Sequence, residues 1–250
     1  APLGEVISVS SLQGPLAVTS HGVYAGTTNF TPTTFFVRSG PDAKGHKVTP
    51  TGAILSASML AWNASMGADA QGNIYVKGRD GSNNQTTVWR IAPDHTSTVA
   101  WTSADESGPQ EGVTVGPDGA LYVATSTSVW KITNPGSATP GTPVRVGWTT
   151  GPANILSVDT DGNVYMHDGS SAALNVLSPA GTPSAITPKF NSASTAFNNI
   201  VAGADGYVYA TKDSRLFRAP NGSQDFTEVA DVAAEMGVGY IAPKVGHVTA

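Results

Sequence analysis

The feature that most constrains this chain is a hairpin pattern that occurs five times. Each copy is an alternating apolar run, a turn that ends in Gly and a second run centred on Tyr, as in GVTVGPDGALYVAT (112–125). Alternation with a period of two around an Asp-Gly type of turn is typical of an antiparallel β-hairpin. The five hairpins cover residues 16–26, 66–78, 112–125, 155–168 and 200–212. Their Tyr anchors are spaced 51, 47, 43 and 44 residues apart: Tyr24, Tyr75, Tyr122, Tyr165 and Tyr209. Such even spacing indicates an internal repeat.

Each hairpin is followed by two further strand-like segments. The predicted third strands are 33–39, 86–92, 128–133, 172–178 and 214–219, and the predicted fourth strands are 53–57, 96–102, 143–149, 183–187 and 226–232. Four antiparallel strands in a repeat of this length are typical of a propeller blade. A lone blade cannot bury both of its faces, so neighbouring blades must stack on one another. Since no low-complexity linker interrupts the series, the sequence predicts an all-β fold, a single β-propeller domain over residues 1–250.

The number of blades depends on the two ends of the chain. Five blades account for residues from about 15 to 232, which leaves the strand-like segments 4–11 and 237–250. Paired with each other, these segments would form a three-stranded sixth blade shared by both termini, and this would remove an open sheet edge. The alternative is a five-bladed ring with the termini laid over the seam. We favour six blades.

Composition argues against several classes of protein. Charged residues make up only 12% of the chain, and the net charge of −5 comes with no basic run, which argues against a nucleic-acid partner. No apolar run approaches the ~18 residues of a membrane span. The absence of Cys excludes disulfides and thiolate chemistry. A start at Ala1 without Met favours a secreted, extracellular or periplasmic protein. So do four Asn-x-Ser/Thr sequons, unless these arise by chance in an Asn-, Ser- and Thr-rich chain: Asn29, Asn63, Asn84 and Asn221.

The hairpins resemble the blades of three related groups of propellers. The shared pattern is x-Asp-x-x-Gly-x-[Leu/Val/Ile]-Tyr, as in ILSVDTDGNVYM (155–166). It is similar to blades of NHL-repeat domains, streptogramin-lyase-like proteins and the gluconolactonase (senescence-marker) family. We expect the Gly to supply a positive φ, the Asp to cap the turn and the Tyr to fill the space between blades. Because the three groups differ in function, the resemblance implies a fold and no single activity.

A candidate metal site lies where the inner strands begin, 11 residues before each Tyr anchor. This position holds Gln13, Ala64, Glu111, Asn154 and Asn198. The resemblance to gluconolactonases implies that such residues supply oxygen ligands to a divalent cation, which makes Glu111, Asn154 and Asn198 candidate ligands for Ca²⁺ or a similar ion. The chain departs from that family twice. Gln13 stands where the family has Glu, and Asn198 stands where it has an Asp that also acts as base. The alternative interpretation is a set of polar residues that line a wet tunnel mouth.

Aromatic residues provide a second candidate site. Trp62, Trp101 and Trp148 occupy equivalent places in LAWN, VAWT and VGWT, each before a loop that leads back to the axial mouth. Indole rings provide a large amphipathic surface, so these three residues, together with Gln13, could form a rim that binds a sugar. The alternative is that the three Trp residues pack between blades, as we expect of Trp89 and Trp130 in mid-strand.

These patterns lead to two functions of different classes and a third that overlaps with the first. The first is an extracellular binding propeller that recognises a small ligand, a glycan or a protein at the axial face. The second is a divalent-metal-dependent lactonase or lyase of the gluconolactonase type, which would use Glu111, Asn154 and Asn198. The third is a sensor or adhesion module whose rim binds protein. No general base is evident for the enzyme, because His167 and Asp168 are adjacent on a strand and point to opposite faces.

Overall fold

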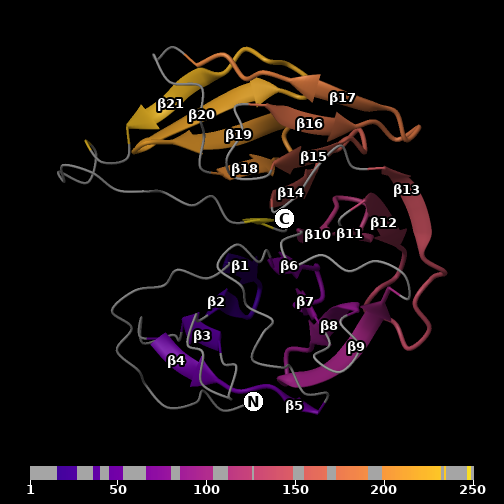
Figure 1. Ribbon diagram of the computed structural model, residues 1–250. Coiled ribbons are helices and arrows are strands. Elements are labelled where there is room, and N and C mark those ends of the chain that lie inside the picture. Colours follow the sequence, from indigo (N-terminus) through magenta and orange to yellow (C-terminus); the bar gives the residue numbers. More distant parts are fainter. Residues whose placement is uncertain are drawn as a thin grey trace.

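The described residues form five sheets, each with four consecutive antiparallel strands, which we number blades 1 to 5 in chain order. In Figure 1 the five blades follow one another around a common centre. This computed structural model describes residues 16–26, 36–39, 45–52, 66–79, 85–103, 112–125, 127–148, 155–167, 173–190, 199–231, 234 and 247–248. Within these ranges almost all regular structure is β-strand.

Each blade uses its strands in chain order. Blade 1 contains β1 (Leu16–Thr19), β2 (Gly22–Gly26), β3 (Phe36–Ser39) and β4 (Gly45–Val48). Blade 2 contains β6 (Met66–Ala68), β7 (Ile74–Arg79), β8 (Thr86–Ile91) and β9 (Thr96–Thr102). Blade 3 contains β10 (Val113–Val115), β11 (Leu121–Ala124), β12 (Ser128–Ile132) and β13 (Val144–Trp148). Blade 4 contains β14 (Ile155–Val158), β15 (Val164–His167), β16 (Leu174–Leu177) and β17 (Pro183–Ile186). Blade 5 contains β18 (Asn199–Ala202), β19 (Tyr207–Lys212), β20 (Arg215–Pro220) and β21 (Thr227–Asp231).

The first strand of each blade lies nearest the centre and the fourth lies outermost (Figure 1). The inner strands of successive blades contact each other in the order β1, β6, β10, β14 and β18. The core lies between the blades, as four apolar clusters that each join one blade to the next. Tyr24, Tyr75, Tyr122 and Tyr165 each belong to a different cluster. This confirms for four of the five Tyr anchors that they fill the space between blades; Tyr209 belongs to none of these clusters.

The predicted strands agree with the structure except at the outer edge of blade 1. The fourth strand was expected at 53–57, but β4 (Gly45–Val48) pairs with β3 instead, with Phe36 opposite Val48. Segment 45–48 contains one apolar residue and follows a Pro- and Gly-containing loop. The apolar pattern therefore predicted the strand at the more apolar segment AILSA (53–57) instead. His46 and Val48 are nevertheless buried, 6% and 2% exposed. Residues 53–57 lie outside the described part of the chain.

Two short strands extend the blades at their edges. β5 (Thr51–Gly52) pairs in parallel with the outer strand of blade 2, at Thr96 and Ser97. β22 (His247–Val248) pairs in parallel with the inner strand of blade 1, at Ala17 and Val18. The C-terminal segment therefore contributes a strand, but this strand joins the inner edge of blade 1 rather than a separate sheet. Segment 4–11 and residues 237–246 are not described, so the sixth blade stays a prediction.

In blades 2 to 5 a hydrogen bond from the hydroxyl of the Tyr anchor to the Asp of the turn stabilises the hairpin. The pair has two forms, which differ in the number of residues between Asp and Tyr. In blades 2 and 4 the Asp precedes the Tyr by six residues, as Asp159 does Tyr165. Oδ1 of Asp159 accepts the backbone N–H groups of Asp161 and Asn163, and Oδ2 accepts the Asn163 amide and the Tyr165 hydroxyl. Asp69, Asn73 and Tyr75 make the same set of bonds in blade 2. The capping role predicted for Asp is confirmed.

In blades 3 and 5 the Asp precedes the Tyr by only four residues. Asp118 accepts the hydroxyl of Tyr122 at 3.0 Å, and Asp205 accepts that of Tyr209 at 2.6 Å. Gly116 and Gly203 then occupy the place that Asp69 and Asp159 hold in the other form. A Cβ at Gly116 would lie 2.7 Å from the Tyr122 ring, so the shorter form requires Gly at this position. The two forms alternate from blade 2 to blade 5.

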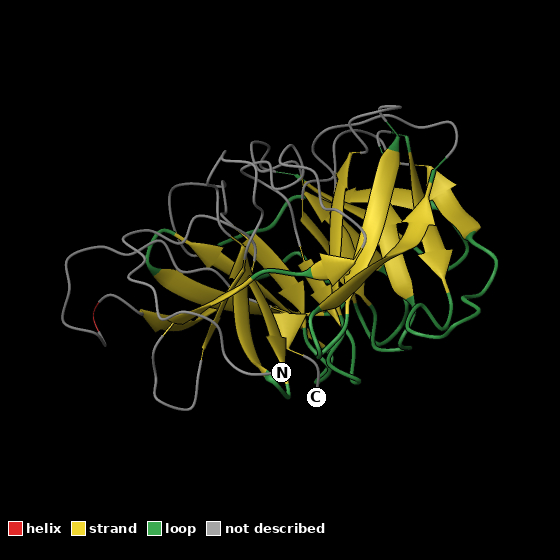
Figure 2. Ribbon diagram, turned by 90° about the horizontal axis from the view of Figure 1, so that it is seen from below, coloured by secondary structure: helices red, strands yellow, loops and turns green. Residues whose placement is uncertain are grey.

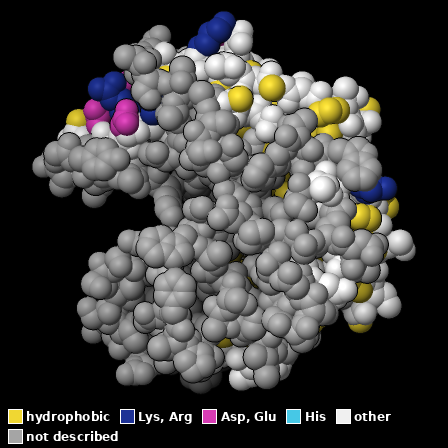
Figure 3. Space-filling view, viewed as in Figure 1, with side chains coloured by type: hydrophobic (Ala, Val, Ile, Leu, Met, Phe, Trp, Pro, Cys, Tyr) yellow, Lys and Arg dark blue, Asp and Glu magenta, His cyan; other side chains and the backbone are white. Residues whose placement is uncertain are grey.

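The surface carries few charges, as the composition requires. Arg215 of β20 makes ion pairs with Glu228 at 3.1 Å and Asp231 at 3.4 Å on the neighbouring outer strand. Figure 3 shows oppositely charged side chains together at this edge of blade 5. Within the described ranges, no helix is long and apolar enough to cross a membrane.

Candidate functional site

The five inner strands begin at one end of the blades, because each is followed by the same kind of hairpin turn at its far end. Several of these turns lie together along one edge of the strands in Figure 2. We call the opposite end, where β1, β6, β10, β14 and β18 begin, the axial end. Glu111 precedes Val113 of β10 by two residues, while Asn154 and Asn198 directly precede β14 and β18. Since β14 contacts both β10 and β18, the chain enters three neighbouring strands from these residues.

The predicted ligands themselves lie outside the described residues. This holds for Gln13, Glu111, Asn154 and Asn198, so the metal site stays a prediction. Among the residues that are described, no three His, Cys, Asp or Glu side chains are grouped closely enough to hold a metal ion.

Polar side chains are buried at the axial end, on the second strand of each of three blades. Lys77, His167 and Thr211 all lie two residues after a Tyr anchor. His167 is paired with Ile155, the first residue of β14, and Thr211 with Asn199, the first residue of β18. Lys77 directly follows Val76, the partner of Met66 at the start of β6. The exposed fractions are 4% for Lys77 and 1% for both His167 and Thr211.

Lys212 adds a further buried cation between blades 4 and 5. Its side chain is 2% exposed, and Nζ lies 5.2 Å from the centre of the Phe190 ring, which follows β17. A Lys side chain is almost never fully buried unless it is paired, and Lys77, His167 and Lys212 each have an interaction partner. Toward the turn end of these strands, the Ser157 hydroxyl accepts the N–H of Ala202, the last residue of β18, at 2.8 Å and ties β14 to β18. The axial end therefore carries a buried polar layer on a rigid scaffold.

The sequence analysis missed this polar layer, although a signal was present. One position of the repeat, two residues after the Tyr anchor, holds Lys77, His167 and Thr211. The same position holds Ala124 in blade 3 and Gly26 in blade 1. A polar residue at a position that alternation assigns to the interior is the feature to look for. His167 was set aside because Asp168 is next to it, yet the structure shows His167 buried at the end of β15, opposite the first residue of β14.

Comparisons with solved structures support the propeller expectation. The virginiamycin B lyase of Staphylococcus aureus superposes with a TM-score of 0.59 at 14% identity, covering 88% of this chain and 71% of the lyase. A gluconolactonase of Xanthomonas campestris gives 0.59 at 15% identity, covering 82% of this chain and 70% of the enzyme. A structure of YCF48 bound to D1 peptide gives 0.56 at 10% identity, with coverages of 91% and 70%. No protein-family model and no curated protein matches the sequence. The fold is a β-propeller, similar to those of the lyase and gluconolactonase structures.

These propellers do not share one function. They include a lyase, a gluconolactonase and a protein in complex with a peptide. Identities of 10–15% establish the fold and leave the activity to the site.

The Trp residues fall into two environments. Trp89 is 4% exposed and belongs to the cluster between blades 1 and 2, as expected of a packing residue. Trp101 is half-buried, packs against the cluster between blades 2 and 3, and lies 5.9 Å from the ring centre of Trp130. Trp148 is the last residue of β13. Its side chain, like the whole of Trp62, lies outside the described part of the chain. The aromatic rim stays a prediction, since Trp101 combines packing with partial exposure.

One of the four sequons has a structural role. Nδ2 of Asn221 lies 3.4 Å from both the Thr160 hydroxyl and a carboxylate oxygen of Asp161, in a turn of blade 4. Its Oδ1 is buried. A glycan on Asn221 would displace these contacts, so the case for export depends on Asn29, Asn63 and Asn84, which lie outside the described residues.

Proposed function

We propose that this chain is a ligand-binding β-propeller whose site lies at the axial end. The observation that carries the proposal is the burial of Lys77, His167 and Lys212 from three blades at that end. Buried ionisable groups are costly, and they concentrate where a protein binds a ligand or performs chemistry. The inner strands that begin there come from separate repeats, so the loops before them can vary without disturbing the blades.

The side chains favour a ligand rich in oxygen atoms. Ammonium groups and a histidine ring donate hydrogen bonds to carboxylate and hydroxyl oxygens. Hydroxyls such as that of Thr211 both donate and accept, which suits a sugar. We therefore place a small acidic molecule or a glycan ahead of a protein as the ligand, with Trp62, Trp101, Trp148 and Gln13 as candidate contacts.

We expect glucuronate, gluconate or an acidic glycan to raise the melting temperature of the chain. A ligand at 100 times its Kd stabilises a protein by about 2.7 kcal/mol, which corresponds to roughly 5–10 °C for a chain of this size. Lys77→Met and His167→Gln should each weaken binding by about tenfold or more, because each removes a donor from the polar layer. Differential scanning fluorimetry followed by titration calorimetry measures both effects.

Arg215→Gln is the matched control, since Arg215 is an exposed cation on an outer strand of blade 5. It should leave binding unchanged. The proposal fails if no acidic or neutral sugar of the panel binds, or if Lys77→Met and His167→Gln bind as tightly as the unaltered chain while remaining folded.

The second candidate is a metal-dependent lactonase or lyase, and His167 favours it. Glu111, Asn154 and Asn198 would supply hard oxygen donors, which fit a cation such as Ca²⁺, but with a single carboxylate. Positive charge on Lys77 and Lys212 at the same end opposes a cation. His167, opposite the residue that follows Asn154, places an imidazole at the axial end, where no general base was evident from the sequence. A histidine-to-alanine variant of the S. aureus lyase is described as catalytically inactive.

Metal binding would stabilise the folded chain by mass action. On metal-stripped protein, millimolar Ca²⁺, Mg²⁺ or Zn²⁺ should raise the melting temperature by several degrees, and Glu111→Gln should abolish the rise. A melting temperature that none of the three ions changes would remove this candidate and leave the binding proposal standing.

Secretion remains part of the proposal. A low-charge propeller with sequons at Asn29, Asn63 and Asn84 fits an extracellular or periplasmic ligand-binding protein.

A further inference from the structure

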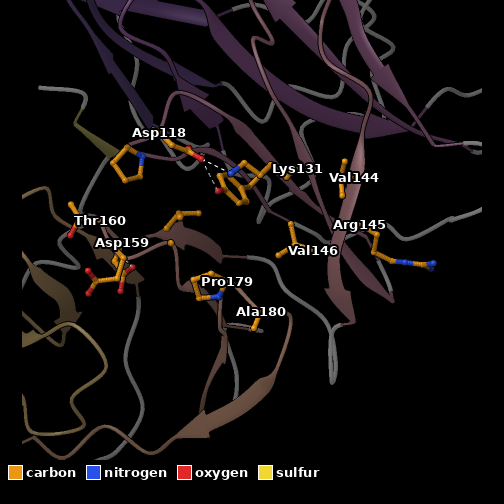
Figure 4. Close-up of a pocket in the computed structure, with 14 residues that line it drawn as sticks. Asp118, Lys131, Val144, Arg145, Val146, Asp159, Thr160, Pro179 and Ala180 are labelled. Atoms are coloured by element: carbon orange, nitrogen blue, oxygen red, sulfur yellow. Dashed lines mark hydrogen bonds and ion pairs between the residues drawn. The ribbon is translucent and has the colours of Figure 1, made fainter.

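A groove of about 690 Å³ lies between blades 3 and 4, at the end opposite the axial site. One wall is formed by Asp118 and Tyr122 of the blade 3 hairpin and by Lys131 of β12. The other is formed by the blade 4 hairpin, residues 158–162, and by Pro179 and Ala180 of the turn before β17. Figure 4 shows Asp118 and Lys131 facing Pro179 and Ala180 across this space, while Arg145 points away from it. The volume is within the range of sites that bind ligands.

Blades 1 to 4 each have an equivalent space beside the Tyr anchor, between that blade and the next. After blades 1, 2 and 4, the next blade fills this space with the turn between its third and fourth strands. His95 meets the ring of Tyr24 edge-on, with ring centres 6.4 Å apart. The backbone N–H of Gly222 donates to the hydroxyl of Tyr165 at 2.8 Å.

After blade 2, the space is filled by a glycine-containing turn of blade 3. Arg90, which pairs with Tyr75 across the sheet, donates through its guanidinium to the carbonyl of Gly136. A Cβ at Gly136 would lie 3.0 Å from the Asn73 amide and 3.3 Å from the Tyr75 hydroxyl, so a larger residue would press against both. In two of these spaces, the backbone of a glycine in one blade therefore packs against the Asp–Tyr pair of the blade before it. These glycines are Gly136 and Gly222.

Blade 4 leaves the space after blade 3 open because its turn is placed elsewhere. Turn length does not decide this, since the turn 178–182 has five residues and the turn 92–95, which brings His95 to Tyr24, has only four. The turn 178–182 packs on the outer strand β13, where a Cβ at Gly181 would lie 2.6 Å from the carbonyl oxygen of Val146. Tyr122 is covered by its own blade, with Lys131 Nζ 5.4 Å from its ring centre.

The polar groups that hold glycine turns elsewhere are present in the groove. Lys131 pairs with Tyr122 as Arg90 pairs with Tyr75, and its Nζ lies 2.7 Å from Asp118. An ammonium has three N–H donors, so Lys131 can also donate to a peptide carbonyl. The Tyr122 hydroxyl donates to Asp118 and can accept a peptide N–H, as Tyr165 does from Gly222. Val144, 61% exposed, offers apolar surface beside them.

The charges of this pair persist over a wide pH range. Burial raises the pKa of Asp118, but hydrogen bonds from Lys131, Ala120 N–H and Tyr122 outweigh it and lower the pKa overall. The hydrogen bond to Asp118 raises the pKa of Lys131. A lowered carboxyl pKa keeps Asp118 charged above its usual 3.8, and a raised amine pKa keeps Lys131 charged up to at least its usual 10.5.

We propose that the groove between blades 3 and 4 binds a glycine-containing turn of a partner protein. The partner's glycine lies against the Asp118–Tyr122 pair, its carbonyl accepts from Lys131, and its flanking residues contact Val144 and Pro179. The groove thus reproduces between two proteins the contact that Gly136 and Gly222 make within this one.

A cyclic peptide with the sequence of Thr133–Gly141 is the probe. In the chain this loop is closed by the N–H of Gly141, which donates to the carbonyl of Thr133 at 2.8 Å. We expect saturable binding of the labelled peptide to the whole chain, with a Kd on the order of 0.1–1 mM, because one turn buries little surface. Lys131→Met should weaken it about tenfold or more, since a charge-assisted hydrogen bond is lost. Fluorescence anisotropy gives the affinities, and amide chemical shifts identify the face that is bound.

Two matched controls separate this contact from general adhesion. Lys189→Met removes an exposed lysine that pairs with Asp225 at 3.9 Å, and should leave binding unchanged. A peptide with Leu in place of the glycine at position 136 should not bind. The proposal is overturned if the peptide shows no saturable binding at 10 mM, about ten times the weakest expected Kd. Equal binding by the Leu peptide or by Lys131→Met, or shifts that spare Tyr122 and Val146, would also overturn it.

Discussion

Asp159→Ala is expected to lower the free energy of unfolding by about 3–5 kcal/mol. Asp159 is fully buried and accepts four hydrogen bonds, from two backbone N–H groups, the Asn163 amide and the Tyr165 hydroxyl. Its loss leaves these donors without their acceptor inside the protein, and each unsatisfied buried group is costly. For a chain of this size the melting temperature should fall by roughly 10 °C, which thermal and denaturant unfolding both measure.

Asp205→Ala is the control, because Asp205 makes the corresponding bond to the Tyr anchor in the short form of the hairpin. Asp205 accepts the Tyr209 hydroxyl at 2.6 Å, but the pair is exposed to solvent and water can replace the lost acceptor. We expect a change below about 1 kcal/mol. Equal losses for Asp159→Ala and Asp205→Ala would mean that burial does not determine the strength of the Asp–Tyr bond.

Trp89→Ala should be comparably damaging, with a loss of about 3–5 kcal/mol, because it opens a cavity in the cluster between blades 1 and 2. Trp101→Ala should cost about 1–2 kcal/mol, since its indole is half-buried and keeps one face against Trp130. Urea unfolding compares the two, with Val99→Ala on the same outer strand as the control for an exposed residue, 53% exposed.

The same variants test the aromatic rim. A rim residue loses ligand affinity while the chain stays folded, whereas a packing residue loses stability alone. If Trp101→Ala costs as much stability as Trp89→Ala and leaves binding of an acidic sugar unchanged, Trp101 is a packing residue and the rim proposal is wrong.

Most of the blade architecture could be predicted because local rules determine it. Period-two alternation and the Asp-Gly turns locate the hairpins, and the turn glycines Gly72, Gly119, Gly162 and Gly206 do adopt positive φ between 73° and 84°. The fourth strand of blade 1 could not be predicted, because Gly45–Val48 owes its pairing to β3 and to the burial of His46 rather than to its own apolar pattern.

The sites were harder to predict than the strands. Position in the repeat indicates which residues approach the axial end, and it selected Glu111, Asn154 and Asn198 on that basis. Alternation also assigns Lys77 to the interior, but this signal is easily passed over, since lysine is ordinarily a surface residue. The groove beside Tyr122 depends on where the turn 178–182 packs, which is a tertiary contact with β13 and leaves no periodic signal.

The two Asp–Tyr forms alternate from blade to blade. The unit that can be exchanged in this scaffold is therefore a pair of blades rather than a single blade. Blades 2 and 4 have the long form, and each receives a glycine from the blade that follows, at Gly136 and Gly222. Blades 3 and 5 have the short form, with Lys131 and Arg218 paired with the Tyr. Deleting or inserting a single blade would set two like hairpins side by side and mismatch the turn that covers the Tyr. An engineered propeller of different size should therefore gain or lose blades two at a time, with 66–148 as the unit to copy.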